Sequence, residues 1–426
     1  MNRYYSSLAL VAVPVLILLL SSQRRKKPIA DKRTKTVVIV GGSYAGIGVA
    51  QGLLKQLPHH VKVILINPSD LFFFNIASPR IIAKPDAFAQ EKYLFSIPEL
   101  FAKQPADRFE LVLGKATAID SDGKSVTVVE SNTNGSSAPP RPIAYDYLVI
   151  ASGSTTQSTI GSDSLNVPFK PTGDNDKLFS QIKAAQATLK DANSVIIGGA
   201  GPVGVEFAGE LAEAFAAHKK QNTQITIVSA TEMVLPGIKP AGHARAQKFL
   251  TSLGVKIIAG AKVLQSAEDA ATKKWTVTLS TGETLTADAY VSAIGVLPNN
   301  DFIPPSFLND NGFVPVDGQC RVRTATGNPI ANDIYALGDI THHPYRVVSL
   351  LPTQIGAVVT NLKSDILGSG KRVTGYDQTK QMFVMIVPVG QSQGTGQFGW
   401  WTPPSFLVSF VKGRDFLTSR AKGMVS

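Results

Sequence analysis

The chain has 426 residues, of which 44% are hydrophobic and 17% are charged, so wholesale disorder is excluded and two or three domains are expected. Cys320 is the only cysteine, which excludes internal disulfides, a cysteine-based zinc cluster and a redox-active cysteine pair. The formal net charge is +11, of which residues 24–35 supply +6 and residues 411–426 supply +3. A nucleic-acid surface is not expected, because the long middle of the chain is nearly neutral.

The amino end predicts a single-pass membrane anchor. Residues 8–20 form an unbroken apolar run, and the flanking residues extend it to about 19 where a spanning helix needs roughly 17–25. Basic residues 24–27 follow it, where a secretory signal would carry a small-residue cleavage site. The positive-inside rule then places the body of the protein in the cytosol. A cleaved signal and a mitochondrial or other targeting leader stay open, so a mitochondrial membrane is also a candidate location.

The first predicted dinucleotide-binding unit begins at Thr36–Val40, a β-branched run typical of a buried parallel strand. A glycine-rich turn, a helix and a second strand, Val61–Ile66, follow, so the helix N-terminus can hold a pyrophosphate. Two residues depart from the usual pattern: Ser43 replaces the middle glycine, and Asn67 stands where an acid would bind a ribose hydroxyl. Asn67 can still make that bond. The predicted ligands in the turn are Gly41, Gly42, Ser43, Ala45 and Gly46.

A second unit of the same kind begins at Ser194, 158 residues after Thr36. Its predicted strands are Ser194–Ile197 and Gln224–Val228. Its turn carries a complete GxGxxG pattern, and its predicted ligands are Gly199, Gly201, Pro202, Val203 and Gly204. Ser229 ends the second strand and no arginine follows it, so NADH and NADPH are both open. Glu232 favours NADH slightly.

Two such units in one chain predict a flavin beside a nicotinamide, because hydride passes from one ring to the other. The expected cofactors are therefore FAD, with NADH or NADPH as reductant. The expected fold class is α/β, with two Rossmann-like domains, one inserted in the other, a small C-terminal α+β unit and an N-terminal transmembrane helix. The predicted segments are the anchor 1–35, the FAD domain 36–155 and 300–370, the NAD(P)H domain 156–299 and the C-terminal unit 371–426.

Three further motifs carry a family resemblance. Tyr145–Ser154, Tyr290–Pro298 and Ile334–Asp339 resemble the crossover turns and the Gly-Asp motif of the pyridine nucleotide-disulfide oxidoreductase superfamily. The resemblance implies that the glycine and aspartate of the last motif bind the ribityl or phosphate part of FAD. The cofactor-binding residues that it adds are Ala151, Ser152, Gly153, Gly295, Gly338 and Asp339.

Four segments carry a narrower resemblance: Phe72–Asn75 followed by Arg80, the turn Gly201–Glu206, Tyr335–Asp339, and Val411–Phe416 near the carboxyl end. In these segments the chain resembles the apoptosis-inducing-factor-like branch of that superfamily, in particular ferroptosis-suppressor-type NAD(P)H:quinone oxidoreductases. Without a cysteine pair, electrons would leave the flavin directly. The resemblance implies a membrane-anchored FAD-dependent oxidoreductase that passes hydride from NAD(P)H to FAD and electrons on to a quinone-type lipophilic acceptor. The alternatives are a flavin-containing redox-sensing or binding protein of the apoptosis-inducing-factor type and a biosynthetic flavoenzyme acting on a specialised metabolite.

Two side chains are candidates beyond the turns. Glu206 is predicted to lie near the nicotinamide as a catalytic residue, and its alternative role is a carboxylate favourably placed at a helix N-terminus. Arg80 is predicted to neutralise a flavin phosphate or the reduced flavin, and its alternative is an ordinary surface arginine. No metal site is predicted. Aromatic and basic residues from 398 onward suit contact with membrane lipid, or packing on the flavin domain.

Overall fold

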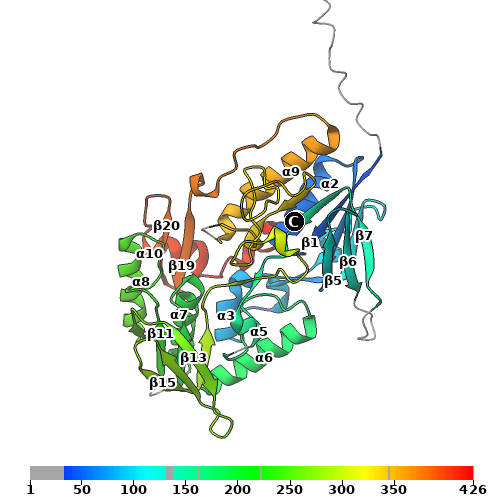
Figure 1. Ribbon diagram of the computed structural model, residues 1–426. Helices are drawn as coiled ribbons and strands as arrows, with labels where there is room; N and C mark the ends of the chain where they lie inside the picture. The colour runs from blue at the N-terminus through cyan, green and yellow to red at the C-terminus, as the bar shows by residue number, and fades with distance from the viewer. Residues whose placement is uncertain (1–32, 131–137, 162, 221–222, 344–345, 426) are drawn as a thin grey trace, which may run out of the picture.

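The computed structural model describes residues 33–130, 138–161, 163–220, 223–343 and 346–425, and Figure 1 shows how their elements are arranged. The predicted membrane segment, residues 8–20, lies outside these ranges. Within them, no helix combines the length and the apolar character needed to cross a bilayer.

A seven-stranded sheet forms the flavin side of the molecule, at the right of Figure 1, in the order β18-β8-β1-β2-β5-β6-β7. Strands β18, β8, β1, β2 and β5 are parallel, and β6 and β7 extend the sheet antiparallel. Strand β1 is buried from Val37 to Val40, as its β-branched run predicted for a strand covered on both faces. The strands are β1 (Lys35–Val40), β2 (Val61–Asn67), β5 (Phe109–Asp120), β6 (Ser125–Glu130), β7 (Arg141–Ala144), β8 (Tyr147–Ile150) and β18 (Ile334–Ala336).

Two helices from distant parts of the chain pack together against this sheet. They are α2 (Tyr44–Gln56) and α9 (Leu351–Leu367). A Cβ on Gly48 would lie 2.6 Å from Cδ1 of Ile355, so a larger residue there would displace the end of that side chain. The end of the chain returns to the same place, since Nε2 of Gln51 donates to the carbonyl oxygen of Val425 over 2.7 Å.

The second sheet, at the lower left of Figure 1, is parallel and has the order β12-β11-β10-β16. A three-stranded antiparallel sheet, β13-β14-β15, accompanies it. The elements of this side are α6 (Asn175–Asp191), β10 (Ser194–Gly198), α7 (Pro202–Ala217), β11 (Gln224–Val228), α8 (Pro240–Ser252), β12 (Lys256–Ile258), β13 (Val263–Glu268), β14 (Trp275–Leu279), β15 (Thr284–Ala287) and β16 (Ala289–Ser292).

Short elements connect the two sides. Strand β9 (Ser154–Thr155), where the chain leaves the flavin sheet, pairs antiparallel with β17 (Leu297–Pro298), where it returns. The remaining short elements are β3 (Leu71–Phe73), α3 (Ser78–Ala83), β4 (Leu94–Ser96), α4 (Ile97–Leu100) and α5 (Gln157–Ile160).

The C-terminal unit consists of a hairpin and a chain of short turns. Strand β19 (Val384–Val389) pairs with β20 (Gln393–Phe398), α10 (Ser405–Val408) follows, and a single π-helical turn covers Ser409–Gly413. Strand β19 is only partly buried over its first three residues. Met382 is exposed, and burial begins at Val387, where the strand packs against α7.

Candidate active site

The first glycine turn closes between β1 and α2 in a way that only glycine permits at two positions. Gly41 has φ +116°, and a Cβ there would lie 2.2 Å from the carbonyl oxygen of Ala151. A Cβ on Gly46 would lie 1.8 Å from the carbonyl oxygen of Gly41. Ser43 has φ −117°, an extended conformation open to any residue, so its departure from the glycine pattern does not disturb the turn. The turn fits a pyrophosphate at the N-terminus of α2.

Asn67 lies beside this turn at the end of β2. Its Oδ1 accepts a hydrogen bond from the backbone N–H of Gly42 over 2.8 Å, and its Nδ2 donates to the carbonyl oxygen of Ser69 over 2.6 Å. The amide therefore buttresses the glycine turn. The ribose contact predicted for Asn67 stays a prediction.

The crossover residues lie against the same turn. Ala151 is the residue that Gly41 approaches, and Oγ of Ser152 donates to the carbonyl oxygen of Asn299 over 2.8 Å. Gly153 takes φ +67°, and its carbonyl oxygen accepts from the backbone N–H of Asn299 over 3.1 Å. The outgoing and returning strands are thus tied together next to the first cradle.

The Gly-Asp motif also reaches this cradle. Gly338 has φ +79°, and a Cβ there would meet that of Ala45 at 3.3 Å. Oδ2 of Asp339 accepts from Oγ of Ser154 over 3.0 Å and from Nζ of Lys170 over 2.7 Å. Burial alone would raise the pKa of Asp339, but the ammonium of Lys170 and the hydrogen bonds outweigh burial, and this pKa lies below its usual value. Asp339 is therefore an anion beside the turn, and Lys170 is a site residue that the sequence did not reveal.

The second glycine turn repeats the geometry of the first, between β10 and α7. Gly199 has φ +104°, and a Cβ there would lie 2.5 Å from the carbonyl oxygen of Ala293. A Cβ on Gly204 would lie 2.0 Å from the carbonyl oxygen of Gly199, whereas the space around Gly201 is open. Pro202 opens the helix, where its missing N–H costs no hydrogen bond. This turn likewise fits a pyrophosphate.

The other residues predicted for the second cradle lie around it. Ser229, at the end of β11, is buried and its Oγ donates to the carbonyl oxygen of Met233 over 2.8 Å, so the hydroxyl holds its own loop. Val203 is exposed in the first turn of α7. Gly295 takes φ +62° with open space where a side chain would stand.

Glu206 lies in the second turn of α7 and is buried, at 3% exposure. Its Oε1 lies 2.6 Å from Nζ of Lys412, which the π-helical turn brings in from the C-terminal unit. Burial raises the pKa of Glu206, the charge of Lys412 opposes the rise, and the net pKa lies above its usual value. The sequence pattern points to Glu206, but not to Lys412, which lies 206 residues away in the chain.

Arg80, at 4% exposure, is not a surface arginine, and that alternative is wrong. Its Nε and Nη2 each lie 2.7 Å from a carboxylate oxygen of Glu210, which is fully buried on α7. Its Nη1 and Nη2 also donate to the carbonyl oxygens of Arg414 and Gly413. All three guanidinium nitrogens bond to protein atoms, so this arrangement gives no support to the predicted contact with a flavin phosphate.

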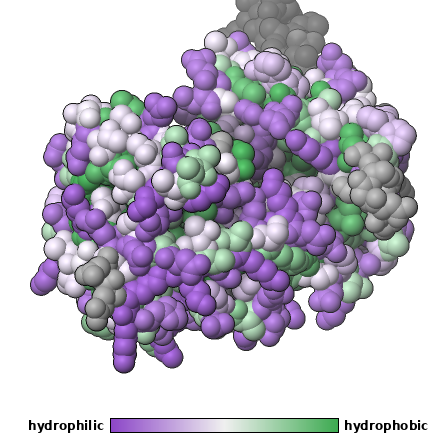
Figure 2. Space-filling model, turned by 90° about the horizontal axis from the view of Figure 1, so that it is seen from below, coloured by the Kyte–Doolittle hydropathy of each residue, from purple (hydrophilic) through white to green (hydrophobic). Residues whose placement is uncertain are grey.

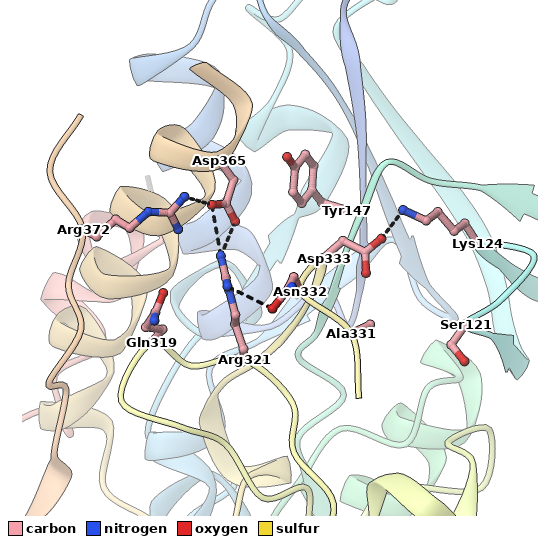
Figure 3. Close-up of a pocket in the computed structure, with 10 residues that line it drawn as sticks. All are labelled: Ser121, Lys124, Tyr147, Gln319, Arg321, Ala331, Asn332, Asp333, Asp365 and Arg372. Atoms are coloured by element: carbon pink, nitrogen blue, oxygen red, sulfur yellow. Dashed lines mark hydrogen bonds and ion pairs between the residues drawn. The ribbon is translucent and has the colours of Figure 1, made fainter. Parts of the chain in front are cut away.

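One cavity lies away from both cradles. It has a volume of about 690 Å³ and lies at the opposite end of the flavin sheet, where Tyr147 begins β8 and Asp333 precedes β18 (Figure 3). Its charged side chains face one another: Arg321 and Arg372 pair with Asp365, and Lys124 pairs with Asp333. Dinucleotides bind at the carboxyl ends of parallel strands, so this cavity is not part of the cofactor site.

Two glycine cradles, each following a parallel strand and joined by the paired strands β9 and β17, are typical of an oxidoreductase that binds two dinucleotides. The chain belongs to the pyridine nucleotide-disulphide oxidoreductase family, whose model matches residues 35–360. Its cofactors are FAD and NAD(P)H.

Individual comparisons agree with that assignment. The chain is 34% identical to oxidoreductase ptaL of Pestalotiopsis fici, over 91% of this chain and 98% of that protein. It is 24% identical to ferroptosis suppressor protein 1 of Xenopus tropicalis, over 90% and 94% of the two chains. The structure of the sulfide:quinone oxidoreductase from Aquifex aeolicus has the same fold, with a TM-score of 0.71, 18% identity and 92% of each chain covered.

Proposed function

We propose that this protein is a membrane-associated FAD-dependent NAD(P)H oxidoreductase that passes electrons to a quinone-type lipophilic acceptor, in the manner implied by its resemblance to ferroptosis-suppressor-type enzymes. The observation that carries the proposal is the buried pair of Glu206 and Lys412, 2.6 Å apart, at the junction of the nicotinamide side and the C-terminal unit. The chain's single cysteine excludes a redox disulfide as the next electron carrier.

FAD supplies the redox chemistry, since it takes a hydride from NAD(P)H and passes the electrons on to an acceptor. The protein contributes placement. Both glycine turns would hold a pyrophosphate at a helix N-terminus, and the ionised Asp339 could accept hydrogen bonds from hydroxyl groups of a bound cofactor. Such positioning can lower a barrier by several kcal/mol.

Glu206 and Lys412 contribute charge and a proton-holding site. The raised pKa of Glu206 brings its carboxyl closer to neutrality than an exposed glutamate, so Oε1 can hold or release a proton. The Nζ of Lys412 adds a positive charge in a buried setting, where electrostatic effects are stronger than in water. Reduction of a quinone to a quinol consumes protons as well as electrons, and this pair suits that requirement.

The C-terminal unit supports a membrane setting. Trp400 is 81% exposed, Phe406 74% and Phe410 61%, and Arg414 lies over the ring of Phe410. Aromatic and basic side chains together suit a lipid interface. The face seen in Figure 2 is, by contrast, mostly hydrophilic, with hydrophobic residues in small groups. Together with the apolar run 8–20, the exposed aromatics favour contact with a membrane, and the basic residues 24–27 favour a body on its cytosolic side.

Anaerobic stopped-flow absorbance tests the proposal. The FAD-loaded protein is mixed with NADH or NADPH and then with a soluble ubiquinone analogue. Fast bleaching of the flavin band and fast reoxidation by the quinone are the expected results, and the two nucleotides will show which is preferred. Bleaching without reoxidation would remove the quinone and favour an oxidoreductase acting on another metabolite. An absence of bleaching with both nucleotides would favour a binding or sensing role.

A further inference from the structure

Three segments that are distant in the chain meet at the side chain of Arg80. The arginine belongs to α3 on the flavin side, Glu210 belongs to α7 on the nicotinamide side, and the two carbonyl oxygens that it binds belong to the C-terminal unit. The ring of Phe416 packs against the guanidinium, with its centroid 4.6 Å from Cζ. A planar group with five donors is needed to serve a carboxylate and two carbonyls at once.

The backbone held by Arg80 is the one that presents Lys412. The bonded carbonyls are those of Gly413 and Arg414, which directly follow this lysine. Farther along, Phe416 has φ +51° and Leu417 has φ +65°, a conformation that costs energy for side chains of this kind. Contacts from outside the segment must therefore hold it in place. Arg80 supplies three of them: the hydrogen bonds to the carbonyl oxygens of Gly413 and Arg414, and the contact with the ring of Phe416.

We propose that Arg80, oriented by Glu210, is a positioning residue that sets the ammonium of Lys412 against Glu206, rather than a ligand of the flavin. Glu210 is also paired with Lys84, over 2.9 Å, so its charge has a second partner. The particular contribution of Arg80 is therefore its hold on the backbone after Lys412. The inference rests on the proposed function only in taking the Glu206–Lys412 pair to act in flavin reduction.

The test is Arg80→Lys in the full-length protein, which keeps the positive charge but loses the planar fork. The rate of flavin bleaching by NAD(P)H, in which a hydride leaves the nicotinamide and reduces the flavin, is expected to fall about 10- to 100-fold. Bound FAD per chain should stay within about 2-fold of the unmodified protein, because Arg80 does not hold the flavin. Lys84→Gln is the matched control, since it touches Glu210 without touching the C-terminal carbonyls.

A double-mutant cycle separates positioning from general damage. If Arg80 acts through Lys412, Arg80→Lys combined with Lys412→Gln should bleach no more slowly, within about 2-fold, than Lys412→Gln alone. Amide hydrogen exchange across residues 409–416, measured without nucleotide or flavin, should be faster in Arg80→Lys than in Lys84→Gln. This second readout does not depend on enzyme activity, so it tests the inference even where the proposed acceptor or reductant fails.

Three results would overturn the inference. They are rate losses that multiply in the double variant, unchanged exchange over 409–416, and loss of FAD with an unchanged bleaching rate in the loaded fraction. The last would return Arg80 to the role of flavin ligand. If Arg80→Lys does not fold, Glu210→Gln is the second variant, because it weakens the ion pair that orients the guanidinium of Arg80. It should then speed exchange over 409–416 and slow bleaching, and no change in either would count against the proposal.

Discussion

Replacing Lys412 by methionine tests the buried pair through stability alone. The change leaves the carboxylate of Glu206, which is 4% exposed, without the ammonium that lies 2.6 Å away. Breaking a buried ion pair by removing one partner costs about 3–5 kcal/mol, because the remaining charge has lost both water and its counterion. Protonation of Glu206 offers an escape, since burial already raises its pKa and removal of Lys412 takes away the main influence that lowers it.

The loss of folding stability in Lys412→Met should therefore depend on pH. An acid whose pKa is raised by folding stabilises the protein at low pH, and this contribution is lost as pH rises through the folded-state pKa. Each pH unit in that range is worth about 1.4 kcal/mol. Lys412→Met should thus be more destabilised at pH 8 than at pH 6, by about 1–3 kcal/mol over this interval.

Urea unfolding of the flavin-free protein, followed by tryptophan fluorescence at both pH values, measures this difference. The double variant Glu206→Gln/Lys412→Met removes both charges, and it should regain most of the stability and lose the added pH dependence. Equal destabilisation of Lys412→Met at pH 6 and pH 8 would refute the reasoning, since it would mean that the protonation of Glu206 does not change over this interval.

Three further predictions concern the cradles and the exposed aromatics. Gly204→Ala places a Cβ 2.0 Å from the carbonyl oxygen of Gly199. The KM for NAD(P)H should therefore rise about 10-fold or more, while bound FAD per chain is unchanged. A loss of FAD instead would contradict the assignment of the two cradles. Asp339→Asn removes a half-buried anion that faces Lys170, so flavin content after gel filtration should fall, and full retention would argue against Asp339 as a flavin ligand. Trp400→Ser should lower turnover of a long-chain quinone in bilayers about 3- to 10-fold, but not that of a water-soluble analogue. Leu264→Ser, at a residue that is 68% exposed on the nicotinamide side, is its control, and an equal loss in both variants would speak against the aromatic surface.

The parts of the site that could be predicted from the sequence are those with a local cause. Gly41 and Gly199 take positive φ values that most residues avoid, and the strand before each and the helix after it are encoded within a few residues. Gly46 and Gly204 must be small because the helix passes over the turn that precedes it. A pattern of glycines between a buried strand and a helix therefore contains most of the information needed to place the turn.

The parts that could not be predicted depend on contacts between distant segments. Lys170 reaches Asp339 across 169 residues, and Lys412 reaches Glu206 across 206. Neither lysine carries a local signal, because a lysine that pairs with a distant acid looks like any other lysine in the sequence. The motif around Arg80 draws attention to this residue, but its partners cannot be predicted from the sequence, since two of them are backbone carbonyls that any sequence would supply.

The C-terminal unit connects the chemistry of the buried site with the outer surface. Lys412 pairs with Glu206 inside the protein, while Phe410, two residues earlier on the same turn, is 61% exposed. A lysine cannot carry electrons, so this unit contributes charge and shape, and electrons must leave to an acceptor that comes from outside. Exposed aromatic rings on the same unit as Lys412 suit an acceptor that is itself apolar and resides in lipid. On this reasoning, loosening the contact between Arg80 and the turn should impair flavin reduction, whereas removing the exposed rings should impair only the delivery of a membrane-bound acceptor.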